Sequence, residues 1–175
     1  MGFLEKKSTL ENSTKSFSDK TSSRKRDYLM LLKQQNQFEL VVKSFNHIFI
    51  NDCNSTDING CMATIDQLEG SVIWINYGPK LARNYSEIIP LIKKKVRAVF
   101  SFGPETGFVH WATEQKVEMF VKTETLKEAI ILANLYAIDG ETIVFAPGAE
   151  YDGKGEADWV EEFKEGIAGL TERKY

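Results

Sequence analysis

Residues His47 to Asp57 read HIFINDCNSTD, an apolar run followed directly by a cluster of polar residues. The run His47–Asn51 consists largely of residue types that favour a β-strand. The polar cluster opens the segment Ser55–Leu68, in which capping residues precede apolar side chains that recur at helical spacing. A strand that leads straight into a capped helix is the first half of a βα unit, so this stretch predicts a parallel sheet.

The same alternation continues toward the C-terminus. Four more β-rich runs follow, at Val72–Asn76, Val96–Phe102, Val117–Val121 and Thr142–Ala146. Helical patterns accompany them, at Tyr85–Lys95, from a capping Thr123 to Ala137, and from about Asp158 to Leu170. The pattern predicts an α/β domain, with a Rossmann-like, mostly parallel sheet of about five strands flanked by helices.

The N-terminal residues differ from this domain in composition. Residues Met1 to Arg26 are rich in Ser, Thr, Lys and Arg and poor in apolar groups, so they cannot bury enough surface to offset their ordering entropy. From Asp27 to Gln37 a short apolar stripe predicts a helix that docks on the domain or on a partner. We therefore divide the chain into a basic Ser/Thr-rich tail with a short helix, residues 1–37, and one domain, residues 38–175.

Composition excludes several classes of function. The chain has 175 residues and a formal net charge of −3, which gives no electrostatic footprint for nucleic acid. No apolar run approaches the roughly 20 residues of a membrane span, and the first residues lack a signal-peptide hydrophobic region. We expect a cytoplasmic protein without a membrane or nucleic-acid partner. Cys53 and Cys61 lack the spacing of a metal site, so we expect reduced thiols and no metal.

Ligands of open parallel sheets bind beyond the carboxyl ends of the strands, which directs attention to four loops. After Asn51, the start of the predicted helix can hold a carboxylate or phosphate; alternatively, Asn51, Asp52 and Ser55 simply cap the helix and its turn. In the second loop, Lys80 either pairs with an anionic group or is a solvated surface charge.

The other two loops carry weaker signals. Residues Ser101–Gly107 lack the spacing and the lysine of a phosphate-binding loop and indicate a plain turn. In the fourth loop, Glu150 and Asp152 either bind a cation or an amine or are solvated. Neither His47 nor His110 has a nucleophile to activate, so we predict structural roles for both and no catalytic residue.

Several of these segments resemble one known family. The run FELVV, from Phe38, followed by HIFINDCNSTD resembles the opening of the Mur ligase C-terminal domain, where an "HRLE"-like run precedes a strand ending in "NDSKATN". Three further segments agree in order with the branch that adds D-glutamate to UDP-N-acetylmuramoyl-L-alanine: Asn76–Lys80 with "GGxxK", Thr123–Ala137 with "TLEEAV", and Glu141–Tyr151 with "GDxVLLSPACAS". The resemblance covers most of Phe38 to Leu170.

The resemblance implies a Rossmann-like domain that binds the incoming amino acid and closes over ATP held by a separate central domain. Asp52 and Thr56 match the family's Asp and Thr, and Lys80 matches the lysine that pairs with the D-glutamate carboxylate. The implied ligands are an amino acid or a UDP-muramoyl precursor. Nothing in the chain resembles the UDP-sugar-binding domain or the central GKT/S loop, so we expect no cofactor in this chain; ATP and Mg²⁺ require that separate domain.

The chain also departs from the family pattern. The lysine of "NDSKATN" is Asn54 here, its last asparagine is Asp57, and the serines of "SPACAS" are lost beside Glu150. One positive charge is lost and negative charge is gained where anionic ligands are expected, which disfavours the family's usual ligands. The predicted substrate-binding residues are Asp52, Asn54, Thr56, Lys80 and Glu150.

Three hypotheses of function follow. The first is a C-terminal-type, amino-acid-binding domain of a D-glutamate ligase-like protein of peptidoglycan precursor synthesis, which is not a complete ligase by itself. The second is a degenerate, non-catalytic module whose tail engages a protein partner. The third is a domain that works in trans with a separately encoded ATPase domain.

Overall fold

The computed structural model describes residues 40–44, 46–78, 85–150 and 153–171. The predicted tail, its short helix and the boundary at residue 37 lie outside these residues and stay predictions. Lys80 and Asp152 also lie outside them. No helix among the described residues is long and apolar enough to cross a bilayer.

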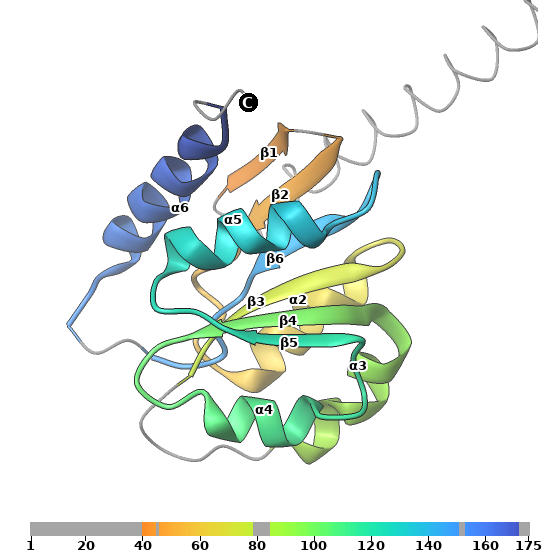
Figure 1. The fold of residues 1–175 in the computed structure, drawn as a ribbon. Helices are drawn as coiled ribbons and strands as arrows, with labels where there is room; N and C mark the ends of the chain where they lie inside the picture. The colour runs from red at the N-terminus through yellow and green to blue at the C-terminus, as the bar shows by residue number, and fades with distance from the viewer. Residues whose placement is uncertain (1–39, 45, 79–84, 151–152, 172–175) are drawn as a thin grey trace, which may run out of the picture. The chain divides into compact units, whose positions relative to one another are not determined.

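The described residues form one six-stranded sheet in the order β1-β2-β6-β3-β4-β5 (Figure 1). Its strands are β1 Leu40–Ser44, β2 His47–Asn51, β3 Val72–Tyr77, β4 Val96–Phe102, β5 Met119–Lys122 and β6 Thr142–Phe145. The strands β2 to β6 run parallel, which confirms the predicted fold class and all five predicted strands. Strand β5 begins at Met119, two residues later than predicted.

β1 is a sixth strand that the sequence pattern did not predict. It pairs antiparallel with β2, so that Leu40 lies opposite Asn51 and Ser44 opposite His47. The turn between the two strands places Asn46 at a φ of 66°, a left-handed conformation that Asn tolerates better than most residues. Because the turn contains neither glycine nor proline, the usual hairpin signal is missing from the sequence.

Five α-helices and one short 3-10 helix are described. They are α2 Ile58–Gln67, η1 Ser86–Ile88, α3 Ile89–Lys95, α4 Gly107–Thr113, α5 Leu126–Tyr136 and α6 Glu156–Thr171. The cap of α5 is Thr125 and not Thr123, because Glu128 stands three residues after Thr125 and its amide donates to the Thr125 hydroxyl at 3.1 Å. Helix α4 was not predicted from the sequence, where we expected only a turn at Ser101–Gly107.

The helices cover both faces of the sheet. In Figure 1, α5 and α6 pack together in front of the sheet and α2 lies behind it. The main core lies under α5 and α6, where Phe49, Ile75, Phe100 and Phe145 of the strands meet Phe163 of α6, all of them 1% exposed or less. This burial holds the sheet rigid up to the carboxyl ends of its strands.

The amino ends of the parallel strands form the opposite edge of the sheet, the amino edge. There Arg97 links β4 to the turn before β6. Its Nε and Nη2 atoms donate to the two carboxylate oxygens of Glu141, each at 2.7 Å, and its guanidinium lies 4.3 Å from the centre of the Tyr136 ring. Burial alone would raise the pKa of Glu141, but hydrogen bonds from Arg97 and from the Ile138 amide outweigh it and lower this pKa. This pair therefore remains charged as the solution becomes mildly acidic.

Lys95, the last residue of α3, closes the end of α2. Its Nζ atom donates to the carbonyls of Ile65 at 3.4 Å and Leu68 at 2.8 Å, and also to that of Asp66. These carbonyls lie where a helix leaves its acceptors without partners. Lys95 therefore fixes the two helices to one another behind the sheet.

Candidate functional site

The candidate site lies at the carboxyl edge of the parallel strands. The loop that follows β2, residues 52–57, contacts the loop that follows β6, residues 146–150, because the Gly148 amide donates to the Ser55 carbonyl at 2.8 Å. Asp52, Asn54 and Thr56 occupy the first of these loops and Glu150 the second. The fold thus brings together the loops that carry four of the five predicted site residues.

Asp52 faces the protein interior. It is 3% exposed, and its Oδ2 atom accepts hydrogen bonds from the hydroxyls of Ser55 and Thr64. Burial raises the pKa of Asp52, and the two hydroxyl groups offset this only in part. In this structure the carboxylate fastens the loop to α2, and it does not point into solvent.

The start of α2 is already capped by a side chain of the protein. Oδ1 of Asp57 accepts a hydrogen bond from the Gly60 amide at 2.9 Å, so the N-cap is Asp57 rather than Asn51, Asp52 or Ser55. The negative charge of Asp57 thus occupies the position at the start of α2 that we considered for a bound carboxylate or phosphate ligand. The two neighbouring predicted site residues remain accessible, since Asn54 is exposed and Thr56 half-buried.

Two carbonyls of the loop after β6 are held by buried side chains. The indole Nε1 of Trp74 donates to the Ala146 carbonyl at 2.7 Å, and Nδ2 of Asn76 donates to the Pro147 carbonyl at 2.8 Å. Gly148 follows at a φ of 70°, and a Cβ there would lie 3.2 Å from Sγ of Cys61. The loop is therefore tightly fixed as far as Ala149, after which Glu150 is exposed.

Gly78 fixes the start of the loop that leads to Lys80. Its amide donates to the Phe102 carbonyl at 2.6 Å, and its own carbonyl accepts from the Glu105 amide at 3.2 Å. A Cβ at this position would lie 2.5 Å from the Glu105 carbonyl oxygen, so only glycine fits. The Ser101–Gly107 turn thus holds Gly78 in place, a role that its sequence did not reveal.

A cavity of about 230 Å³ opens at the same edge, beside the starts of α5 and α6. Tyr77, Phe102 and Trp159 form its aromatic wall. The ammonium of Lys154 lies 2.6 Å from a carboxylate oxygen of Glu162 and 4.6 Å from the centre of the Trp159 ring. Four of the predicted site residues lie in the described part of the chain, and none of them lines this cavity. The predicted residues and the cavity are therefore separate features of the same edge.

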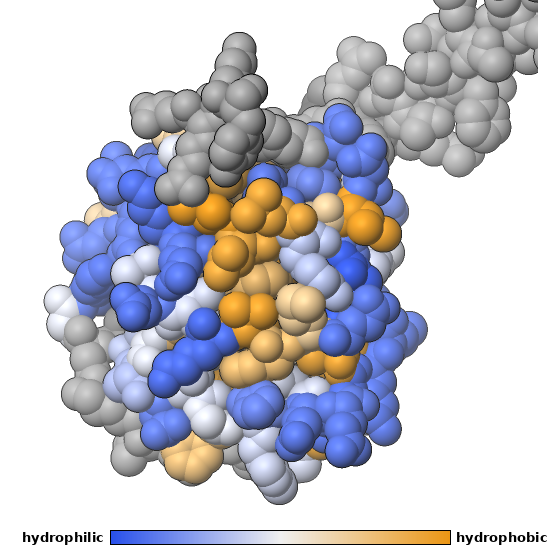
Figure 2. All heavy atoms as spheres, viewed as in Figure 1, coloured by the Kyte–Doolittle hydropathy of each residue, from blue (hydrophilic) through white to orange (hydrophobic). Residues whose placement is uncertain are grey.

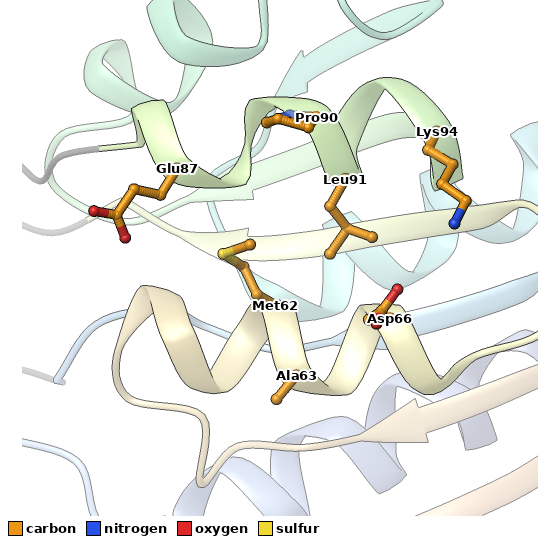
Figure 3. A pocket seen from close by; sticks show the side chains of 7 residues that line it. All are labelled: Met62, Ala63, Asp66, Glu87, Pro90, Leu91 and Lys94. Carbon is orange, nitrogen blue, oxygen red and sulfur yellow. The ribbon is translucent and has the colours of Figure 1, made fainter.

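A larger cavity, of about 430 Å³, lies between α2 and α3. Figure 3 shows Met62 of α2 and Leu91 of α3 pointing into the space between the two helices, with Glu87 at one end and Asp66 and Lys94 at the other. None of the four predicted site residues that the structure describes lines this cavity either. No group of three or more His, Cys, Asp or Glu residues in the described ranges is arranged to hold a metal ion.

Buried polar residues that the sequence pattern did not mark organise this edge. Thr64 is 6% exposed, and its hydroxyl donates a hydrogen bond to Asp52. Asn76 is 0% exposed, and its side chain donates to the Pro147 carbonyl in the loop after β6. Asn51 is also fully buried, and neither atom of its amide group has a partner among the described residues. Burial raises the pKa of the Cys61 thiol well above its ordinary range, with the Asp52 and Asp57 charges adding to the effect, which disfavours the nucleophilic thiolate form.

Comparison with known proteins supports the resemblance inferred from the residues. The chain is 26% identical over 138 residues to the UDP-N-acetylmuramoylalanine--D-glutamate ligase of Christiangramia forsetii, a match that covers 78% of this chain and 31% of that protein. It is 27% identical over 99 residues to the ligase of the same name from Methylococcus capsulatus, covering 57% of this chain and 21% of that protein. No family model matches the chain.

Solved structures agree with the fold. A domain from a putative UDP-N-acetylmuramate:L-alanyl-gamma-D-glutamyl-medo-diaminopimelate ligase of Haemophilus ducreyi superposes with a TM-score of 0.52 at 14% identity, over 76% of this chain and 97% of that domain. These findings confirm the resemblance to the Mur ligases and are consistent with a C-terminal-type domain. The chain spans 21% to 31% of the length of the two curated relatives named above.

Proposed function

We propose that this chain is an amino-acid-binding domain of the Mur ligase C-terminal type, related to the part of a ligase that receives D-glutamate. The observation that carries the proposal is the convergence of two loops, residues 52–57 and 146–150, at the carboxyl edge, in segments that resemble the D-glutamate-adding branch. In this proposal Thr56 and Lys80 contact the ligand, and Asp52 positions the loop from inside.

The proposed ligands are a free amino acid and the UDP-muramoyl precursor to which it is joined. No residues of this chain are assigned to ATP or Mg²⁺, which a separate central domain would hold. A complete ligation would then require that domain, either in the same polypeptide or in trans. The proposal includes a cytoplasmic location, with which the free thiols of Cys53 and Cys61 agree.

A ligand titration tests this function. Amide chemical shifts of the isotope-labelled chain are recorded while D-glutamate, the UDP-muramoyl precursor, or ATP with Mg²⁺ is added up to millimolar concentration, the range of weak binding. We expect saturable shifts at residues 52–57 and 148–150 with D-glutamate or the precursor. Lys80→Ala should weaken binding, whereas Lys93→Ala, an exposed lysine on α3, should leave it unchanged.

The second candidate function is a non-catalytic interaction module. It is favoured by the negative charge at the rim, where Asp57 caps α2 and Glu150 is exposed. If none of the three ligands shifts any amide of these loops, the amino-acid-binding proposal is overturned. A degenerate module would then be the better description.

A further inference from the structure

The aromatic cavity beside the starts of α5 and α6 combines three packed rings with acidic side chains. The rings of Tyr77, Phe102 and Trp159 are buried and contact one another edge-on or tilted, with ring centres 5.4 to 6.0 Å apart. Two acidic residues also line the cavity, Glu124 just before α5 and Glu162 on α6. Rings packed in this way form a rigid wall, and the face of an aromatic ring attracts cations.

A cation of the protein itself lies against this wall. The ammonium of Lys154 lies 4.6 Å from the centre of the Trp159 ring and 2.6 Å from a carboxylate oxygen of Glu162. One ring and one carboxylate thus hold a primary ammonium group together. Glu124 has no ion-pair partner in the described part of the chain. Negative charge therefore exceeds positive charge among the residues that line the cavity.

The start of α5 does not offer this cavity an anion site. A helix start attracts anions through amides that have no partner. Here the Glu124 amide donates to the Glu128 carboxylate at 2.7 Å, and the Glu128 amide donates to the Thr125 hydroxyl at 3.1 Å. These bonds occupy two of the amides, and Glu128 adds a negative charge at the helix start. The cavity is thus suited to a positively charged ligand.

Lys154 can leave the cavity at low cost. It lies between Gly153 and Gly155, just ahead of α6, and its side chain is 48% exposed. Gly153 has a φ of 81° and no atom within 4 Å of an added Cβ, so this segment is uncrowded. A half-exposed ion pair contributes little to stability, and a lysine side chain loses much rotamer freedom when it is fixed. An amine from solution therefore competes with a weakly held occupant.

We propose that the aromatic cavity binds an alkylammonium group, which replaces Lys154 over the Trp159 ring and pairs with Glu162. Glu124 supplies the second negative charge. The volume of about 230 Å³ admits the amine end of a small molecule or of a lysine side chain. Figure 2 shows that the surface over α6 is largely hydrophilic, whereas apolar surface gathers over α5 and β5. A small charged ligand therefore suits this side of the molecule better than an apolar partner does.

An amine titration of the full chain tests the proposal. Amide and indole N–H chemical shifts are recorded while n-butylammonium chloride is added, with n-butanol and sodium butyrate as the neutral and anionic probes of similar size. We expect saturable shifts in the millimolar range at residues 124–126 and 159–162 with n-butylammonium only. The indole groups of Trp74 and Trp111 do not line the cavity and serve as internal references. The loops at residues 52–57 and 148–150 should not respond.

A second probe distinguishes two sources of the ammonium group. Nα-acetyl-lysine methylamide carries the amine as a lysine side chain within a peptide backbone. Binding as tight as that of n-butylammonium would indicate that a lysine side chain is accepted. Weaker binding would indicate a free small amine, because the peptide groups would then be excluded from the cavity.

Matched variants identify the groups that hold the amine. Lys154→Ala vacates the cavity and should tighten n-butylammonium binding about threefold to tenfold, whereas Lys164→Ala removes the same charge from the exposed face of α6 and should not. In the Lys154→Ala background, Glu162→Gln should weaken binding about fivefold or more, and Glu161→Gln should change it little.

Several results would overturn the proposal. One is a Lys154→Ala chain, folded by the dispersion of its amide shifts, that shows no saturable shift at tens of millimolar n-butylammonium. Others are equal shifts of the same residues by n-butanol or butyrate, and equal tightening by K164A and K154A, which would indicate a general effect of charge. Binding that E162Q leaves unchanged would also overturn it, because the carboxylate would then have no part in the site.

Discussion

Single residues set the geometry of the carboxyl edge through the backbone. Gly78 approaches Glu105 so closely that no side chain fits, and Gly148 combines a positive φ with tight packing against Cys61 and Asn76. Asn76 holds a carbonyl of the β6 loop, while Ser55 and Thr64 hold the carboxylate of Asp52. The residues that shape this edge are therefore mostly different from those that the sequence marks as ligand contacts.

Gly78→Ala should destabilise the domain more than a glycine replacement in open space. The new Cβ would lie 2.5 Å from the Glu105 carbonyl oxygen, and backbone atoms cannot move aside cheaply, so we expect a cost of about 3 kcal/mol. Gly70→Ala is the control, because Gly70 has a φ of 74° but no atom within 4 Å of the added Cβ, and it should cost about 1 kcal/mol. Urea unfolding measures both; equal costs would contradict the crowding described for Gly78.

Glu141 should make the stability of the domain depend on acidity. Its pKa is lowered in the folded state, so the stabilisation is fully present above its unfolded pKa of about 4.3 and is lost as the pH falls through the folded pKa. Glu141→Gln removes one member of a pair in which Glu141 is buried, and we expect a loss of about 3 kcal/mol at pH 7.

Thermal unfolding at pH 7 and at pH 3 checks this expectation. The difference between the original chain and Glu141→Gln should be large at pH 7 and should shrink at pH 3, because the unfolded state is already protonated there and the stabilisation falls as the pH approaches the lowered folded pKa. Glu161→Gln, on the exposed face of α6, should have little effect at either pH. A difference that does not change with pH would show that the charge of Glu141 is not the cause.

At the scale of elements, the sequence predicted the strands and helices that have a clear hydrophobic period or a capping residue, and it missed two elements that lack these signals. The five parallel strands and four of the helical segments followed from alternating β-rich and helical patterns. β1 was missed because its turn uses Asn46 without glycine or proline, and α4 because its seven residues start at Gly107 after a glycine-proline turn. Both depend on tertiary contacts that no local pattern records.

Lys95 gives an element-scale prediction, because it connects α3 to the end of α2. Lys95→Met keeps the length and the apolar stem of the side chain but removes the ammonium that donates to the carbonyls of Ile65, Asp66 and Leu68. We expect a loss of about 1–2 kcal/mol in the free energy of unfolding. Lys93→Met, an exposed change on the same helix, should cost less than about 0.5 kcal/mol. Equal losses in urea unfolding would contradict the capping role.

At the scale of the whole molecule, the two edges of the parallel strands have different tasks. The amino edge carries the Arg97–Glu141 pair, whereas the carboxyl edge carries the loops, the aromatic cavity and the candidate site. The sequence predicted the candidate site at the carboxyl edge because parallel strands bring their carboxyl ends together, and two of the loops that it singled out do meet there. It could not show that Asp52 points inward or that Asp57 occupies the start of α2, since both follow from side-chain packing across distant segments.

The predicted boundary at residue 37 can be tested on the whole molecule. Deleting residues 1–37 leaves all six strands, and we expect the midpoint of thermal unfolding to change by less than about 4 °C, the shift that about 1 kcal/mol produces in a domain of this size. Deleting residues 1–45 also removes β1 and exposes the edge of β2, so it should lower the midpoint by considerably more. Scanning calorimetry of both deletions decides whether the boundary is right.

The antiparallel direction of β1 has a consequence for any domain joined ahead of it. Because Leu40 lies opposite Asn51, the chain enters the sheet at the carboxyl edge, beside the loops of the candidate site. Had the chain entered directly at His47, it would have joined the sheet at the amino edge, about 17 Å away along the strand. A domain joined ahead of β1 would therefore be attached next to the loops of the candidate site, and this attachment would raise its effective concentration there.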